Sequence, residues 1–170
     1  MDEPPFLFEI HRATALDARA LAILRGAAER ERHPERGDGI GDAFTERCIA
    51  YFQAELGRRS PLVYAWLATV GETAVGMAAL TLATSLPRPM DTGVSGDGRI
   101  RGVYVAPHMR RRGIAGVLVR AAIERAQECG ATRLTLGASP DGKPLYEKFG
   151  FVRNVDEMVL APSDAPESSR

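Results

Sequence analysis

The stretch "RIRGVYVAPHMRRRGIAGVLV", residues 99–119, passes from a strand pattern to a helix pattern at its centre. Its β-branched and aromatic residues predict a strand that Pro107 ends. Apolar residues at helical spacing then predict a helix over residues 110–129, which Gly130 ends in the left-handed conformation. A helix that follows directly on a strand predicts an α/β arrangement, with three consecutive arginines at the junction.

Small residues at this junction, Gly113, Ala115 and Gly116, leave the first helical turn uncovered. The first four N–H groups of a helix lack partners within it and the helix dipole is positive there, so an anion that reaches the backbone finds donors. The arginines at 110–112 add charge around it, and the arrangement suits a pyrophosphate. A structural interpretation also stands, because arginine runs are commonly solvated and small residues let a helix pack closely on a sheet.

Two more helices are predicted upstream, over residues 13–31 and 43–58, the first with Thr14 as N-cap and Asp17 completing a capping box. Helical spacing predicts one apolar face on each of the three helices. These faces are Leu16, Ala20, Ile23, Leu24 and Ala27 in the first helix, Phe44, Cys48, Tyr51, Phe52 and Leu56 in the second, and Val117, Leu118, Ala121, Ala122 and Ala126, with Arg125 beside Ala126, in the third.

Strand patterns occupy most of the remaining chain. They cover residues 62–70 and 73–85 as a hairpin, 99–107, 132–139, and 151–161 as one more strand or a bent pair, with a short helix at 142–150 and an irregular segment at 85–98. Strands linked first by hairpins and later by crossover helices predict a mixed sheet with helices on its faces.

Composition bounds the function. A chain of 170 residues that is 45% hydrophobic predicts a single domain. Lysine plus arginine equals aspartate plus glutamate at 22 each, which argues against nucleic-acid or membrane partners, and no apolar run approaches the ~20 residues of a membrane helix. A cytoplasmic protein is expected, with Cys48 and Cys129 as buried free thiols, no metal site among only three histidines, and a disordered tail "APSDAPESSR".

Two motifs together resemble the GNAT acetyltransferase superfamily. Its acetyl-coenzyme A site has the pattern V-x-V-x-P and then R/Q-x-x-G-x-G/A, matched here by Val103, Val105, Pro107, Arg110, Gly113 and Ala115. The stretch "GASPDGKPLYEKFGF", residues 137–151, is similar to a second signature through Tyr146, Gly150 and Phe151. The resemblance implies an α/β (α+β) GNAT fold in one domain, residues 1–170 with about 6–162 ordered. It also implies a mixed, mostly antiparallel sheet of six to seven strands, about four helices, and a V-shaped splay between the fourth and fifth strands.

The resemblance further implies an N-acetyltransferase that moves acetyl from acetyl-CoA directly to a primary amine of a small molecule or peptide, without a metal. Tyr146 is then the general acid for the leaving thiolate, and a backbone N–H near Val105 stabilises the developing oxyanion. Both residues also have plain structural interpretations as core residues, and Ser139 is an alternative N-cap for the short helix. The implied cofactor-binding residues are Val103, Tyr104, Val105, Arg110, Arg111, Arg112, Gly113, Ile114, Ala115, Gly116 and Ser139.

The general base is left open. Many family members carry a glutamate on the fourth strand, where this chain has Arg101 and Gly102. Candidates elsewhere are Glu31, Glu35, Asp38, Asp97 and Glu157, and water is an alternative. The missing carboxylate keeps a catalytically silent acyl-CoA-binding sensor as an alternative function. The loop after the first helix, residues 29–42, is a candidate rim for the acceptor, and an apolar late strand predicts a homodimer.

Overall fold

The computed structural model describes residues 7–89, 96–154 and 158. The chain divides into two compact units, Met1–Gly137 and Ala138–Arg170. The first unit holds the sheet and three of the helices, and the second holds the helix α4, Lys143–Lys148.

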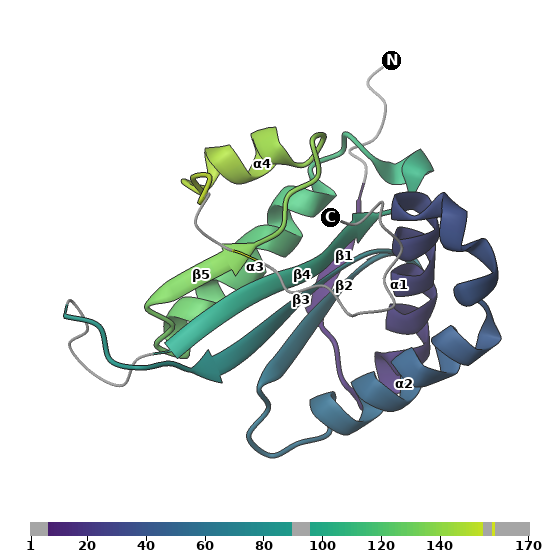
Figure 1. Cartoon of the computed structure of the whole chain (residues 1–170). Helices are drawn as coiled ribbons and strands as arrows, with labels where there is room; N and C mark the ends of the chain where they lie inside the picture. Colours follow the sequence, from purple (N-terminus) through teal and green to yellow (C-terminus); the bar gives the residue numbers. More distant parts are fainter. Residues whose placement is uncertain (1–6, 90–95, 155–157, 159–170) are drawn as a thin grey trace. The chain divides into compact units, whose positions relative to one another are not determined.

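Five strands form one mixed sheet in the first unit (Figure 1). They are β1 Glu9–Arg12, β2 Val63–Val70, β3 Thr73–Thr84, β4 Gly96–Val105 and β5 Arg133–Leu136, in that spatial order. The pairs from β1 to β4 are antiparallel, and β4 pairs with β5 in parallel. The predicted hairpin of β2 and β3 is confirmed, with Gly71 at φ +56° in its turn. A crossover helix between β4 and β5 explains their parallel pairing.

The three helices of the first unit are α1 Ala18–Arg32, α2 Asp42–Leu56 and α3 Ile114–Glu128. In Figure 1, α1 and α2 cover one face of the sheet and α3 covers the other. The alternation along β3 explains both contacts, because Met77 packs with α1 residues while Gly76 faces α3. A Cβ added at Gly76 would lie 3.3 Å from the side chains of Ile114 and Leu118, so this glycine lets α3 approach the sheet closely.

The start of α1 is as predicted, but its buried face agrees with the prediction only in part. Thr14 and Asp17 form the capping box, with the Thr14 amide donating to the Asp17 carboxylate at 2.8 Å. The predicted apolar face is correct only in part: Leu24 is buried and Ala20 packs against the core, but Leu16 is 95% exposed and Ile23 is 52% exposed. The buried residues of α1 are Ala18, Leu21, Ala22, Leu24 and Gly26. Small side chains among them let α1 pack closely against β3 and α2. This close packing stabilises the observed orientation of α1 more than burial of Leu16 and Ile23 would stabilise the predicted one.

The other two predicted faces are correct only in part. Of the α2 face, Phe52 is buried while Tyr51 is 46% exposed. Val117 of α3 is 43% exposed, and the residues that α3 buries are Ile114, Leu118, Val119, Ala122 and Ala126. Both cysteines are free, as predicted, but neither is buried: Cys48 is half-buried, which raises the pKa of its thiol, and Cys129 is exposed.

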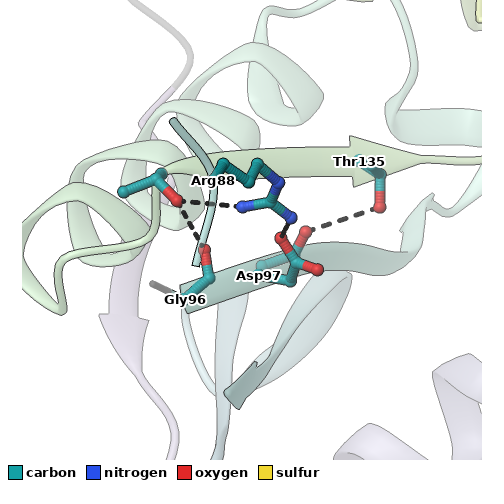
Figure 2. Close-up of polar contacts among 6 residues, drawn as sticks. Arg88, Gly96, Asp97 and Thr135 are labelled. Atoms are coloured by element: carbon teal, nitrogen blue, oxygen red, sulfur yellow. Dashed lines mark hydrogen bonds and ion pairs between the residues drawn. The ribbon is translucent and has the colours of Figure 1, made fainter. Parts of the chain in front are cut away.

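The segment predicted to be irregular, residues 85–98, supplies the first three residues of β4. Gly98 suits the strand because an added Cβ would lie 2.8 Å from the Leu134 side chain of β5. Arg88 anchors this end of the sheet (Figure 2): its guanidinium donates to the Asp97 carboxylate at 2.5 Å and to the Thr132 hydroxyl at 3.1 Å. Gly96 and Gly98 therefore allow close packing of β4, although the many glycines and prolines of this segment predict a loop.

The predicted late strand lies largely outside the described residues. Within it, residues 151–154 have no regular structure. No helix in the described part of the chain is both long and apolar enough to cross a membrane.

Candidate functional site

The C-terminal half of β4 extends past its parallel neighbour. Pairing with β5 covers Asp97–Ile100 against Arg133–Leu136, and β4 then continues to Val105. Its register with β3 shifts between Met77 and Ala79, where Gly102 has φ +59°. This bulge twists the strand at the point where β5 ends. Within the described residues, the β5 side of 101–105 therefore has no paired strand.

The turn after β4 presents backbone donors. A short 3-10 segment, Pro107–Met109, leads to Gly113, which is the N-cap of α3 at φ +84° and offers no capping side chain. No acceptor within the described part of the chain bonds the amides of Gly113, Ile114, Ala115 or Gly116. A Cβ added at Gly113 would meet no atom within 4 Å, so no neighbouring group fills the space beside this residue. This is the geometry of an anion site at a helix N-terminus.

Of the three arginines, Arg110 is turned back onto the protein. Its Nε donates to the Val105 carbonyl at 2.9 Å, and its guanidinium donates to Glu31 Oε2 at 2.6 Å and lies 5.7 Å from the Tyr104 ring centroid. The hydrogen bond to Glu31 is the main reason why the pKa of Arg110 is raised. Arg111, at φ +63°, and Arg112 are exposed on the turn. The positive charge expected around an anion is thus partly engaged by Glu31.

The second unit brings Ser139 and Tyr146 together. Tyr146 is 8% exposed, and its ring packs edge-on against Phe151 with a centroid distance of 6.1 Å. A Cβ added at Gly142 would lie 3.2 Å from both the Ser139 hydroxyl and the Tyr146 ring. The alternative role of Ser139, as the N-cap of α4, is wrong. Its hydroxyl accepts from the Gly142 amide at 3.2 Å in the turn that precedes α4, and Gly142 is the N-cap.

The carboxylates considered as general bases are mostly engaged. Glu31 pairs with Arg110, Glu35 lies 3.1 Å from His33 Nδ1, and Asp97 is held by Arg88 at the far end of β4 from Val105. The side chain of Asp38 and all of Glu157 lie outside the described residues. No group of three metal-ligating side chains occurs among the residues that the structure describes.

Sequence reasoning missed one carboxylate, Glu29. It lies in α1, its side chain is 17% exposed, and it pairs with Arg25 at 2.6 Å. An open hollow of about 700 Å³ is lined by Glu29, Pro34, Glu35, Arg36, Gly39, Ile40 and Phe44. The Arg25 and Glu29 spacing of four residues was a visible signal of an ion pair on a helix, but nothing local indicated that it borders a hollow.

Comparisons of the chain with a family model and with solved structures agree with the geometry of the β4–α3 turn. A family model described as "Acetyltransferase (GNAT) family" matches residues 27–151. No curated protein sequence matches the chain. A predicted acetyltransferase from Clostridium acetobutylicum, solved with acetyl-CoA, is similar at a TM-score of 0.74 and 24% identity, over 91% of this chain and 96% of that chain.

Two further solved structures share the fold. A GCN5-related N-acetyltransferase from Ralstonia eutropha JMP134 has a TM-score of 0.76 and 21% identity over 91% of this chain and 99% of that chain. Glucosamine-6-phosphate N-acetyltransferase from Arabidopsis thaliana has a TM-score of 0.72 and 16% identity over 91% and 98% of the two chains. The resemblance predicted from the two motifs is confirmed. The chain belongs to the acetyltransferase (GNAT) family.

Proposed function

We propose that the chain transfers acetyl from acetyl-CoA to the primary amine of a small molecule or peptide by direct attack. The observation that carries the proposal is the junction of β4 and α3, where the described part of the chain supplies neither a β5-side partner for the strand end nor an acceptor for the amides of 113–116. The amides of 113–116 fit the pyrophosphate, with Arg111 and Arg112 as the exposed cations beside it. The open side of Val103–Val105 fits an extended pantetheine arm.

The proposed chemistry needs two protein groups at the reacting carbon. The amine lone pair attacks the thioester carbonyl, and the Val105 N–H donates to the oxygen as negative charge develops there. The C–S bond then breaks, and the departing thiolate takes its proton from the phenol of Tyr146. Water or a nearby carboxylate removes the proton from the attacking nitrogen.

The hollow beside the end of α1 is the proposed acceptor site. It is lined by a largely buried carboxylate, Glu29, and by the apolar side chains of Ile40 and Phe44. Glu29 also pairs with Arg25 at 2.6 Å, so a primary ammonium bound in the hollow would share this carboxylate with Arg25, and the apolar walls would contact the rest of the acceptor. Arg36 at the same rim gives the hollow both charge signs.

A silent acyl-CoA-binding sensor is the second candidate function. One observation favours it: β4 carries no carboxylate near Val105, and Glu31 is already paired with Arg110. Such a protein binds acetyl-CoA but releases no thiol when amines are added.

Thermal unfolding with acetyl-CoA and with free CoA tests the cofactor site. A ligand at roughly 100 times its dissociation constant stabilises the folded state by about 2.7 kcal/mol. No shift with either ligand refutes the cofactor assignment. Thiol release from acetyl-CoA, measured with a panel of small amines, amino acids, aminoglycosides and peptide N-termini, then separates enzyme from sensor.

The extent of the domain, the number of strands, the cellular location and the oligomeric state are further proposals. We expect one domain over residues 1–170, a sheet completed to six or seven strands with a V-shaped splay after Ile100, and a cytoplasmic homodimer. Light scattering at micromolar concentration tests the dimer, and a mass near 18.4 kDa rejects it.

A further inference from the structure

One ion pair in the first unit connects the cofactor turn to the first helix. Glu31 lies in the last turn of α1, and Arg110 lies 79 residues later between β4 and α3. Their Oε2 and guanidinium nitrogen are 2.6 Å apart, with side-chain exposures of 48% and 40%. The pair is therefore accessible to solvent and is not a core element of the fold.

Arg110 also holds the end of β4. Its Nε donates to the Val105 carbonyl at 2.9 Å, and its guanidinium lies 5.7 Å from the Tyr104 ring centroid. The planar guanidinium offers donors in several directions, so one side chain bonds the strand end and Glu31 together. Arg110 thereby connects the end of β4 to α1 through two hydrogen bonds.

The neighbouring residue in α1 holds the wall of the hollow. Arg30 Nη1 donates to the Ile40 carbonyl at 3.0 Å, across the connection that begins at His33. His33 in turn donates its amide to the Glu29 carbonyl at 2.8 Å and closes the end of the helix. The last turn of α1 thus contacts the hollow through Arg30 and the cofactor turn through Glu31.

We infer that Arg110 and Glu31 form a positioning pair that couples cofactor binding at the turn to the wall of the hollow, residues 33–41. The inference rests on the proposed function. In this role Arg110 acts through α1, and the charge that meets the pyrophosphate comes from Arg111, Arg112 and the backbone amides. Coupling between two sites is reciprocal, so an acceptor in the hollow tightens cofactor binding by the same factor.

The size of the coupling is bounded by the exposure of the pair. Solvent-exposed ion pairs contribute between almost nothing and an amount that corresponds to about fivefold in an equilibrium constant. We therefore expect acetyl-CoA to slow amide exchange across residues 33–41 by up to about fivefold through this contact.

Hydrogen exchange with acetyl-CoA as the probe tests the inference. In the parent protein we expect slower exchange in 113–117, where the ligand touches the backbone, and in 33–41, where it does not. Glu31→Gln preserves the shape of the side chain and removes its charge, so it should keep the first effect and lose the second. Glu128→Gln is the matched control, because it breaks a similar exposed ion pair with Arg125 at the other end of α3.

The outcomes are distinct. Two results overturn the coupling but leave the cofactor site standing. In the first, Glu31→Gln still shows protection of both segments; in the second, the parent protein shows protection of 113–117 alone. Loss of the 33–41 effect in Glu128→Gln also overturns it, since the effect is then not specific to this pair. No protection in either segment of the parent protein overturns the cofactor assignment and the coupling together.

Discussion

Gly113 offers the sharpest test of the cofactor turn. It is the N-cap of α3 at φ +84°, without a capping side chain, and an added Cβ meets no atom within 4 Å. Any L-residue there therefore causes backbone strain without a steric clash. That strain costs about 1–3 kcal/mol of folding stability, in Gly113→Ala and Gly113→Glu alike.

The two substitutions differ in charge. Without ligand, a carboxylate at the N-terminus of α3 is favourable by about 0.3–1 kcal/mol, so Gly113→Glu should be at least as stable as Gly113→Ala. With ligand the sign reverses. At a separation of about 5 Å and an effective dielectric constant of about 20, repulsion from the pyrophosphate costs about 3 kcal/mol, which is more than 100-fold in affinity.

Calorimetric titration with acetyl-CoA and unfolding without ligand measure both effects. We expect the alanine variant to bind with at most a modest loss and the glutamate variant to bind more than about 100-fold more weakly. Equal affinities for the two variants, both folded, would refute an anion at this turn, whatever their stabilities.

Three further predictions concern other parts of the chain. Tyr146→Phe should lower kcat by about 10²- to 10⁴-fold while the acetyl-CoA affinity changes little; unchanged turnover removes Tyr146 from the mechanism. Gly76→Val should lower the free energy of unfolding, measured in urea, by about 1–3 kcal/mol, because an added Cβ lies 3.1 Å from the Tyr104 carbonyl. Gly137→Val is the control and should leave the free energy of unfolding nearly unchanged, because an added Cβ there meets no atom within 4 Å. Asp17→Ala should cost about 1 kcal/mol at pH 7. Burial acts to raise the pKa of Asp17, but its hydrogen bonds with Thr14 outweigh burial, so the pKa is lowered. The stability lost in Asp17→Ala should therefore shrink as pH falls below the ordinary carboxyl range, where Asp17 becomes protonated in the parent protein. A loss of stability that persists in acid refutes the capping role.

Local signals predicted much of the first unit. The β2–β3 hairpin, the Thr14 capping box and the left-handed Gly130 each depend on residues a few positions apart, and all three are present. The turn motif at 110–116 likewise lies in one continuous stretch, so its uncovered helix N-terminus was readable from the sequence.

Features that depend on distant partners were missed. Periodicity on α1 favoured Leu16 and Ile23, but contact with two neighbouring elements selected the stripe with small residues instead. Gly98 looks like a loop residue until β5 lies against it. The Arg110 and Glu31 contact joins residues 79 positions apart, and no local pattern of charge predicts it.

The unpaired end of β4 has a consequence for handling the protein. Among the described residues, 101–105 have no paired strand on the β5 side, and sheet edges with unpaired backbone groups accept strands from other chains. Any extended segment competes for this edge when no ligand lies along it, including one from a neighbouring copy. Self-association of the purified protein on storage and heating is therefore expected to fall when CoA is present, and the benefit comes from occupying a strand position as well as from added folding stability.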